Sequence, residues 1–171
     1  MMRKFKKFLT LTGAFVLFAF CAIAQFTSVK IGVNGLTCSA CTRSVETGLR
    51  KLSFVENVEM SLENKSGIIT FKKGQKVEIE KIASAVTDAG FSVRFLTAEY
   101  NFSKIDFHGS EYSENGHNFY FLKSKPESKN CSLRFIGPTY QTKKEFGKYK
   151  SEFPQLSFKS TDAYYVVPNV K

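Results

Sequence analysis

The strongest constraint on the fold is a switch between two hydrophobic periods that recurs from residue 26 to residue 99. Apolar residues occupy every second position in four short segments, which is the period of a strand with one buried face. These segments are residues 29–33, 58–62, 69–71 and 91–95. Two intervening segments follow helical spacing instead, through Val45, Leu49 and Leu52, and then through Ile79, Ile82, Ala83 and Val86. The predicted order is strand, helix, strand, strand, helix, strand.

This order predicts an α+β fold, the ferredoxin-like βαββαβ sandwich. Each helical segment has a single apolar face, so both helices should lie on one side of a four-stranded antiparallel sheet. Segment 63–67 (ENKSG) has the composition of a turn between the second and third strands. Gly90 follows the second helix, where glycine commonly ends helices.

Residues 100–171 predict a second small α+β unit. Strands are expected at residues 104–107, 119–122, 133–136 and 164–167, and segment 108–118 is expected to be a polar loop. Thr142 and Glu145 form a helix capping box ahead of an apolar stripe that Pro154 ends. The predicted domains are therefore a signal peptide (1–24), the ferredoxin-like domain (25–99) and a C-terminal domain of unknown role (100–171).

The N-terminus has the pattern of a secretory signal peptide. Four basic residues precede an apolar run from residue 8 to 22, and Ala22-Ile23-Ala24 offers a cleavage site. We therefore expect cleavage after Ala24 and a periplasmic or secreted protein with no membrane span in the mature chain. The alternatives are an uncleaved anchor and a lipidated Cys21, although Phe20 is larger than the residue that usually precedes a lipidated cysteine.

The charge of the mature chain argues against nucleic-acid binding. Cleavage would remove four basic and no acidic residues, so the formal charge falls from +10 to +6 (10 − 4), and no arginine-rich block is present. The sequence also has no convincing pair of catalytic carboxylates, phosphate-binding glycine loop or nucleophile–histidine set. We therefore expect a protein that is not an enzyme.

Two cysteines mark the first strand-to-helix corner. Cys38 and Cys41 are two residues apart in a loop, with the helix expected to begin around Cys41. Backbone N–H groups at a helix start lower the pKa of a thiol there. Two thiolates are an incomplete set for zinc but suit a soft ion, with Cu(I) fitting best. Gly35 would let the loop turn, and Leu36 would anchor it in the core.

The segment GLTCSAC (35–41), together with TDAGF (87–91), resembles the heavy-metal-associated domain family over residues 26–99. That family includes copper chaperones, the N-terminal domains of metal-pumping ATPases and periplasmic mercury-binding proteins. The resemblance implies that Cys38 and Cys41 bind Cu(I), Hg(II), Zn(II) or Cd(II). It also implies transfer by thiol exchange to a metal-transporting ATPase or another metal-accepting protein. Leu36 stands where the family has methionine, and Phe91 would lie near the metal loop.

Other interpretations of these residues remain open. Cys38 and Cys41 could perform thiol–disulfide exchange, although Thr37 is not aromatic and no proline precedes Pro126. The domain could also be an interaction module. Cys131 is interpreted as a small core residue, with a third metal ligand or a dimer-forming thiol as alternatives. His108 and His117 are interpreted as exposed loop residues, with Cu(II) or Zn(II) ligation as the alternative.

Overall fold

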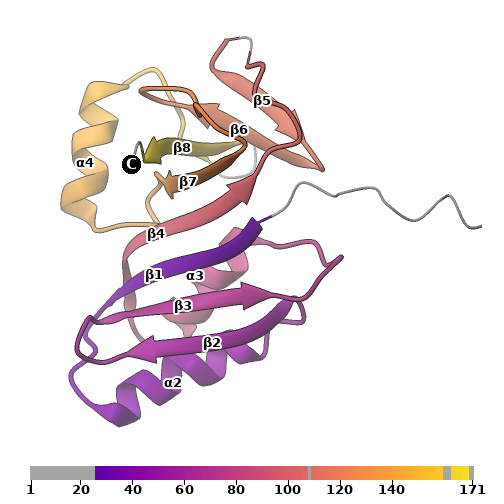
Figure 1. Cartoon of the computed structure of the whole chain (residues 1–171). Coiled ribbons are helices and arrows are strands. Elements are labelled where there is room, and N and C mark those ends of the chain that lie inside the picture. The colour runs from indigo at the N-terminus through magenta and orange to yellow at the C-terminus, as the bar shows by residue number, and fades with distance from the viewer. Residues whose placement is uncertain (1–25, 108, 160–162, 170–171) are drawn as a thin grey trace, which may run out of the picture.

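One continuous sheet of eight strands organises the computed structural model, which describes residues 26–107, 109–159 and 163–169. The strand order is β2-β3-β1-β4-β7-β8-β6-β5 (Figure 1). The expected signal peptide (residues 1–24) and His108 lie outside the described residues. In the part of the chain that the structure describes, no helix is long and apolar enough to cross a membrane.

The first six elements confirm the ferredoxin-like prediction. They are β1 (Phe26–Asn34), α2 (Ser39–Arg50), β2 (Val55–Ser61), β3 (Ser66–Phe71), α3 (Ile79–Asp88) and β4 (Ser92–Asn101). All pairings among β1, β2, β3 and β4 are antiparallel. Both helices lie on the same face of the sheet (Figure 1). Their predicted apolar stripes are buried there, with Val45 and Leu49 on α2 and Ile79, Ile82, Ala83 and Val86 on α3.

The predicted buried face of the fourth strand was only partly right. Val93 is buried as expected, but a register shift between the pairs Gly32–Phe95 and Val33–Val93 inserts an extra residue into β4. Such a bulge reverses which residues face the core. Phe95 therefore lies on the opposite face and covers Gly32, where a Cβ atom would overlap its ring.

The predicted buried face of β2 also needs correction. Leu62 lies beyond the end of the strand and is 38% exposed, and Met60 is half-buried. A second register shift, between Val55 and Asn57, places Val55 in the core together with Val58. In β4 the extra residue breaks the simple alternation on which the prediction depended, whereas in β2 the alternation from residue 58 holds and the strand ends before Leu62.

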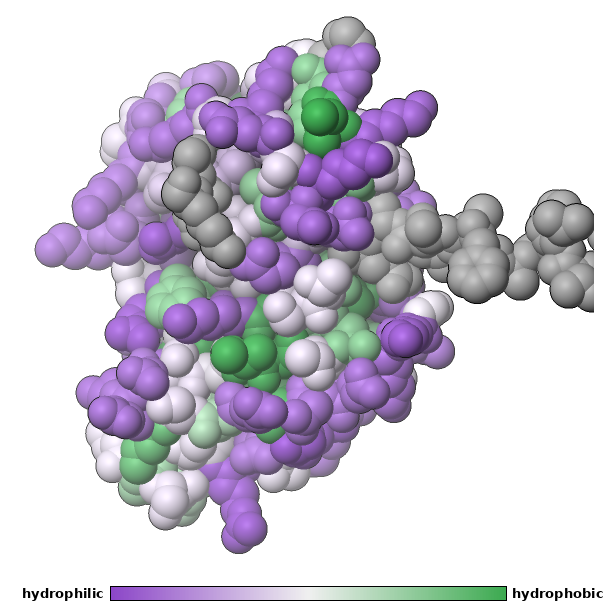
Figure 2. Space-filling model, viewed as in Figure 1, coloured by the Kyte–Doolittle hydropathy of each residue, from purple (hydrophilic) through white to green (hydrophobic). Residues whose placement is uncertain are grey.

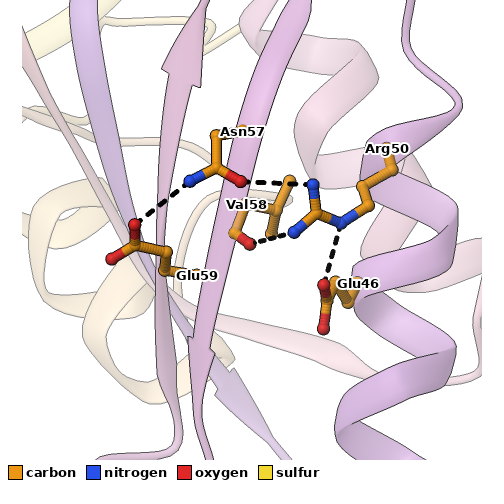
Figure 3. Close-up of polar contacts among 5 residues, drawn as sticks. All are labelled: Glu46, Arg50, Asn57, Val58 and Glu59. Carbon is orange, nitrogen blue, oxygen red and sulfur yellow. Dashed lines mark hydrogen bonds and ion pairs between the residues drawn. The ribbon is translucent and has the colours of Figure 1, made fainter.

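Arg50 fixes the end of α2 to the edge strand β2. Its Nε forms an ion pair with Glu46 at 2.8 Å, and its two terminal nitrogens donate to the Asn57 side chain at 3.2 Å and to the Val58 carbonyl at 2.6 Å (Figure 3). Asn57 in turn donates to Glu59. A charged group that occupies a carbonyl of an edge strand also protects that edge from pairing with another chain.

The second half adds strands and one helix to the same sheet. Its elements are β5 (Glu111–Glu114), β6 (His117–Phe121), β7 (Asn130–Phe135), α4 (Lys143–Glu152) and β8 (Tyr164–Asn169). The three strands expected at residues 119–122, 133–136 and 164–167 are confirmed with shifted ends. The predicted helix is also confirmed, because the Thr142 hydroxyl accepts from the Glu145 N–H at 3.2 Å as its cap.

Two predictions for this half were wrong. Residues 104–107 are not a strand, and the expected loop at 108–118 contains β5 and the start of β6. The β5–β6 hairpin turns at Asn115 and Gly116, whose φ angles are 50° and 73°. Positive φ at both central residues is the requirement of a tight hairpin turn, and the Asn-Gly pair meets it.

Strand β4 joins the two halves. It pairs with β1 on one side and with β7 on the other, both antiparallel. The main core is continuous across this junction, and the ring of Phe26 contacts Tyr100, Phe119, Phe135 and Tyr164. The domain limits expected at residues 25, 99 and 100 stay predictions.

Helix α4 packs on the face of the sheet opposite to α2 and α3. A smaller core forms there from Leu122, Ile136, Phe158 and Tyr165, against the half-buried Phe146 and Tyr149 of α4. No residue of α4 is fully buried. This leaves the face of the sheet away from α2 and α3 covered over the second half only.

Candidate metal centre

The loop between β1 and α2 is fixed by one glycine and one leucine. Gly35 has a φ angle of 89°, and a Cβ atom on it would lie 3.3 Å from the ring of Phe91. Leu36 is fully buried in the main core, as predicted. Phe91 also lies beside this loop, as the family resemblance implies. The backbone after Leu36 is therefore held against the core while the next residues turn outward.

Cys38 is the N-cap residue of α2. The helix begins at Ser39, earlier than the sequence pattern suggested, and Cys38 has extended backbone angles. Its sulfur accepts a hydrogen bond from the Cys41 N–H at 3.3 Å, and its carbonyl accepts one from the Thr42 N–H at 3.1 Å. A thiol sulfur thus takes the place that a serine or aspartate oxygen usually fills at a helix start.

The electrostatic surroundings favour a thiolate at Cys41. The hydrogen bond with the Cys38 side chain is the main cause that lowers the pKa of the Cys41 thiol, and Thr37 contributes in the same direction while burial opposes it. The Thr37 hydroxyl lies 4.0 Å from Cys41 Sγ. Sequence reasoning used Thr37 only as a non-aromatic residue before Cys38. A hydroxyl residue four positions before a helix-start cysteine is the signal that could have identified its role.

The structure brings both predicted ligands to one accessible corner. Cys38 is exposed, Cys41 is half-buried, and both are free thiols. No group of three or more ligand-type side chains (His, Cys, Asp or Glu) forms anywhere within the described residues. The donor set on this part of the chain is therefore two sulfurs, which a soft ion with low coordination number can use.

Cys131 lies far from this corner. It is 8% exposed in β7, and burial, with Glu99 as a lesser cause, raises the pKa of its thiol to about 11. Cys131 pairs with Tyr100, whereas Asn34 at the start of the cysteine loop pairs with Ser92. Eight residues of β4 correspond to roughly 25 Å. Cys131 therefore matches the core interpretation and cannot reach an ion held by the other two cysteines of its own chain.

The expectation that His117 is an exposed loop residue was wrong. His117 begins β6, is 8% exposed, and packs against the rings of Phe26 and Tyr164. Burial, followed by the positive charge of Lys76, lowers the pKa of the imidazole. A histidine enclosed by aromatic rings in a strand is a core residue.

A groove of about 790 Å³ runs between α2 and α3 beside the cysteine corner. Ala40, Gly48 and Ala85 give it a lining of small residues, and Arg43 and Lys51 contribute positive charge. Arg43 is only two residues from Cys41. A partner that approaches the sulfurs would meet this surface at the same time.

The comparisons with known proteins agree with this geometry. The model of the family described as heavy-metal-associated domain matches residues 30–92. The periplasmic component of the mercuric transport protein of Pseudomonas fluorescens is 33% identical over 64 residues, which are 37% of this chain and 69% of that protein. The chain belongs to the heavy-metal-associated domain family.

Copper-transporting ATPase 2 of Rattus norvegicus is 34% identical over 85 residues, which are 48% of this chain. The chain spans only 6% of the length of that ATPase. Among solved structures, oxidized MerP from Ralstonia metallidurans matches with 30% identity and a TM-score of 0.37, over 40% of this chain and 94% of that one.

Proposed function

We propose that this protein carries a soft metal ion, Cu(I), on Cys38 and Cys41 and transfers it to a partner by exchange of thiol ligands. The observation that carries the proposal is the position of the two sulfurs at the start of α2, where the Cys41 N–H and the Cys38 sulfur are 3.3 Å apart. Membership of the heavy-metal-associated domain family supports the same metal-binding role.

The donor set supports Cu(I) as the ion. Two thiolates with no third ligand-type side chain grouped with them among the described residues leave zinc with half of its usual four ligands, whereas Cu(I) accepts soft thiolates. Copper is also the ion in the name of the ATPase relative, and mercury in the name of the bacterial relative. Hg(II) is therefore the next candidate, ahead of Zn(II) and Cd(II).

The exposure of the corner supports transfer by exchange. A thiolate from a partner can bind the ion before Cys38, the more exposed ligand, releases it. A second thiolate of the partner then replaces Cys41, so the ion passes to the partner without being released into solution. Because the partner supplies ligands and no covalent bond of a substrate changes, we propose a carrier and not an enzyme.

We further propose that the acceptor is a metal-transporting ATPase or a similar thiol-bearing protein, reached in the periplasm or outside the cell. The relatives include a copper-transporting ATPase and a periplasmic component of a transport system. The groove between α2 and α3, with Arg43 and Lys51, offers such an acceptor a positively charged surface beside the sulfurs.

The test is a copper titration of the reduced protein against a competing chromophoric Cu(I) chelator. We expect about one Cu(I) per chain, bound tightly enough to remove the ion from the chelator. The double variant Cys38→Ser, Cys41→Ser should fold but lose this binding. The matched control Cys131→Ser should retain it.

A thiol count and a disulfide-exchange assay separate the alternative function. An envelope thiol–disulfide protein would reduce a model disulfide or oxidise a model dithiol with turnover, and this turnover would not require copper. Unchanged copper binding in the Cys38→Ser, Cys41→Ser protein would disprove the metal site. Catalytic disulfide exchange by the wild type would favour the oxidoreductase.

A further inference from the structure

The face of the sheet away from α2 and α3 carries a second groove, which neither Cys38 nor Cys41 lines. Its volume is about 500 Å³, and its walls come from β1, β3, β4 and β7. Figure 2 shows a hydrophobic patch in the middle of this face, over β1 and β3, with hydrophilic surface above and below. Because β7 belongs to the second half, this groove exists only where the added strands extend the sheet.

Strand register places the lining residues in rows across the groove. Ile68 pairs with Lys30, Lys30 with Thr97, and Thr97 with Arg134. One row therefore runs across four strands with a cation on each side of a threonine. Strands lie about 4.8 Å apart, so the Cα atoms of Lys30 and Arg134 are separated by roughly 10 Å.

The two cations of this row have no ion-pair partner within 4.0 Å among the described residues. Arg134 is half-buried, and its Nε is shielded from solvent with no hydrogen-bond acceptor. Glu145 of α4 is close enough to interact electrostatically with Arg134, but its ion pair is with Lys148 at 2.8 Å. A buried donor that lacks an acceptor is costly, and an incoming carboxylate would supply acceptors to this guanidinium.

The neighbouring rows set the rest of the chemistry. On one side Phe95 covers Gly32 and, together with the 47% exposed Ile68, provides apolar surface. On the other side Glu99 lies between Ser28 and Ser132. Glu99 is the acidic residue among those that line the groove, so the two cations leave it a net positive charge of one (2 − 1).

We propose that this groove binds an extended acidic segment of a partner protein, with carboxylates on Lys30 and Arg134 and an apolar side chain on Ile68 and Phe95. An extended chain repeats its side chains on one face every second residue, about 6.6 Å apart. Flexible lysine and arginine side chains can accommodate that spacing over the row of Lys30, Thr97 and Arg134. The serine and threonine hydroxyls can bond the main chain of the segment.

The groove also lies near the cysteine corner. Lys30 is four residues before Asn34, where the strand ends, which is roughly 13 Å along β1. An acidic segment held here would keep its protein within reach of Cys38. Docking on this face uses neither cysteine, so it does not depend on the proposed metal site.

The test uses the metal-free, reduced full-length protein and a short labelled peptide in which a leucine and two glutamates occupy alternate positions, so that all of them lie on one face of an extended chain. We expect shift changes in the NMR amide signals of Ile68, Thr97 and Ser132, and binding that weakens with salt. Charge reversal by Lys30→Glu with Arg134→Glu should weaken binding about tenfold or more. A peptide with glutamine in place of glutamate should bind as weakly to the wild type.

The matched control is Lys73→Glu with Lys129→Glu, two exposed loop lysines outside the groove, which gives the same change in net charge. It should bind the acidic peptide within about twofold of wild type. The milder pair Lys30→Gln, Arg134→Gln covers the case in which charge reversal disturbs folding, and it should still lose affinity. Any of three results would overturn the proposal. The first is shift changes confined to the α2–α3 groove, and the second is equal peptide affinity for the control and the charge-reversal variants. The third is the same pattern of shift changes with acetate alone.

Discussion

The hydroxyl of Tyr164 donates a 2.9 Å hydrogen bond to Oε2 of Glu80. The bond joins β8, the last strand of the chain, to the first turn of α3 in the ferredoxin-like half, across 84 positions of sequence. Burial, with the negative charge of Glu80 as a further cause, raises the pKa of Tyr164. The hydroxyl therefore stays protonated and able to donate.

Removal of this hydroxyl should weaken the contact between the halves. We expect Tyr164→Phe to lower the free energy of unfolding by about 1–2 kcal/mol, because the bond to a carboxylate is lost and Glu80 is left without it. Urea unfolding followed by circular dichroism measures the change. Tyr120→Phe, which removes a hydroxyl that makes no hydrogen bond within the described part of the chain, is the control and should change stability by less than about 0.5 kcal/mol.

Substitution of Gly35 by alanine should destabilise the fold more than the same substitution at Gly74, which also has a positive φ angle. Gly35→Ala forces a side chain into a positive φ and brings its Cβ within 3.3 Å of Phe91, whereas Gly74, at φ 74°, has no atom within 4 Å. We expect Gly74→Ala to cost about 1 kcal/mol of stability from backbone strain alone. Gly35→Ala should cost more and should also weaken copper binding. Equal stability losses with unchanged copper affinity would contradict this account.

The three cysteines within the described residues should react with iodoacetamide at very different rates. At pH 7.5 the exposed corner thiols should alkylate first, because the pKa of Cys41 is lowered and Cys38 is exposed. Cys131, with a pKa of about 11 and 8% exposure, should react at least about a hundredfold more slowly than the corner thiols in the folded protein. Mass spectrometry of timed samples gives the order. Fast labelling of Cys131 under native conditions would show that its strand opens.

His117 should make the fold sensitive to acid. Its pKa is lowered in the folded protein by burial and then by Lys76, so the unfolded chain binds the proton more readily. Stability is therefore fully present above the unfolded value of about 6.5 and falls as the pH drops through the lower folded value, by at most about 1.4 kcal/mol per pH unit. Urea unfolding between pH 7.5 and 5 should show a shallower pH dependence for His117→Phe.

The elements that the sequence predicted well are those with local signals. The apolar stripe from Ile79 to Val86, the cap at Thr142 and the buried Leu36 each follow from residues a few positions apart. The cysteine corner follows in the same way, because a short loop between a strand and a helix places Cys38 and Cys41 together. Which metal they would bind, as proposed, depends on coordination chemistry beyond these two positions.

The elements that were missed depend on pairing between distant residues. One extra residue in β4 moved Phe95 to the other face, which alternation cannot reveal without the partner strand. His117 is buried because β8 and Phe26 enclose it from far along the chain. The β5–β6 hairpin is different, because Asn115-Gly116 was a local turn signal in a segment that composition alone described as a loop.

The double pairing of β4 has a mechanical consequence. Between Thr97 and Tyr100 its residues pair with β1 on one flank and with β7 on the other. A bend of the backbone within this stretch would break hydrogen bonds to one of the two neighbouring strands, so the stretch does not act as a hinge. A protein that binds the strands of the second half would therefore move the cysteine corner together with them, as one rigid body.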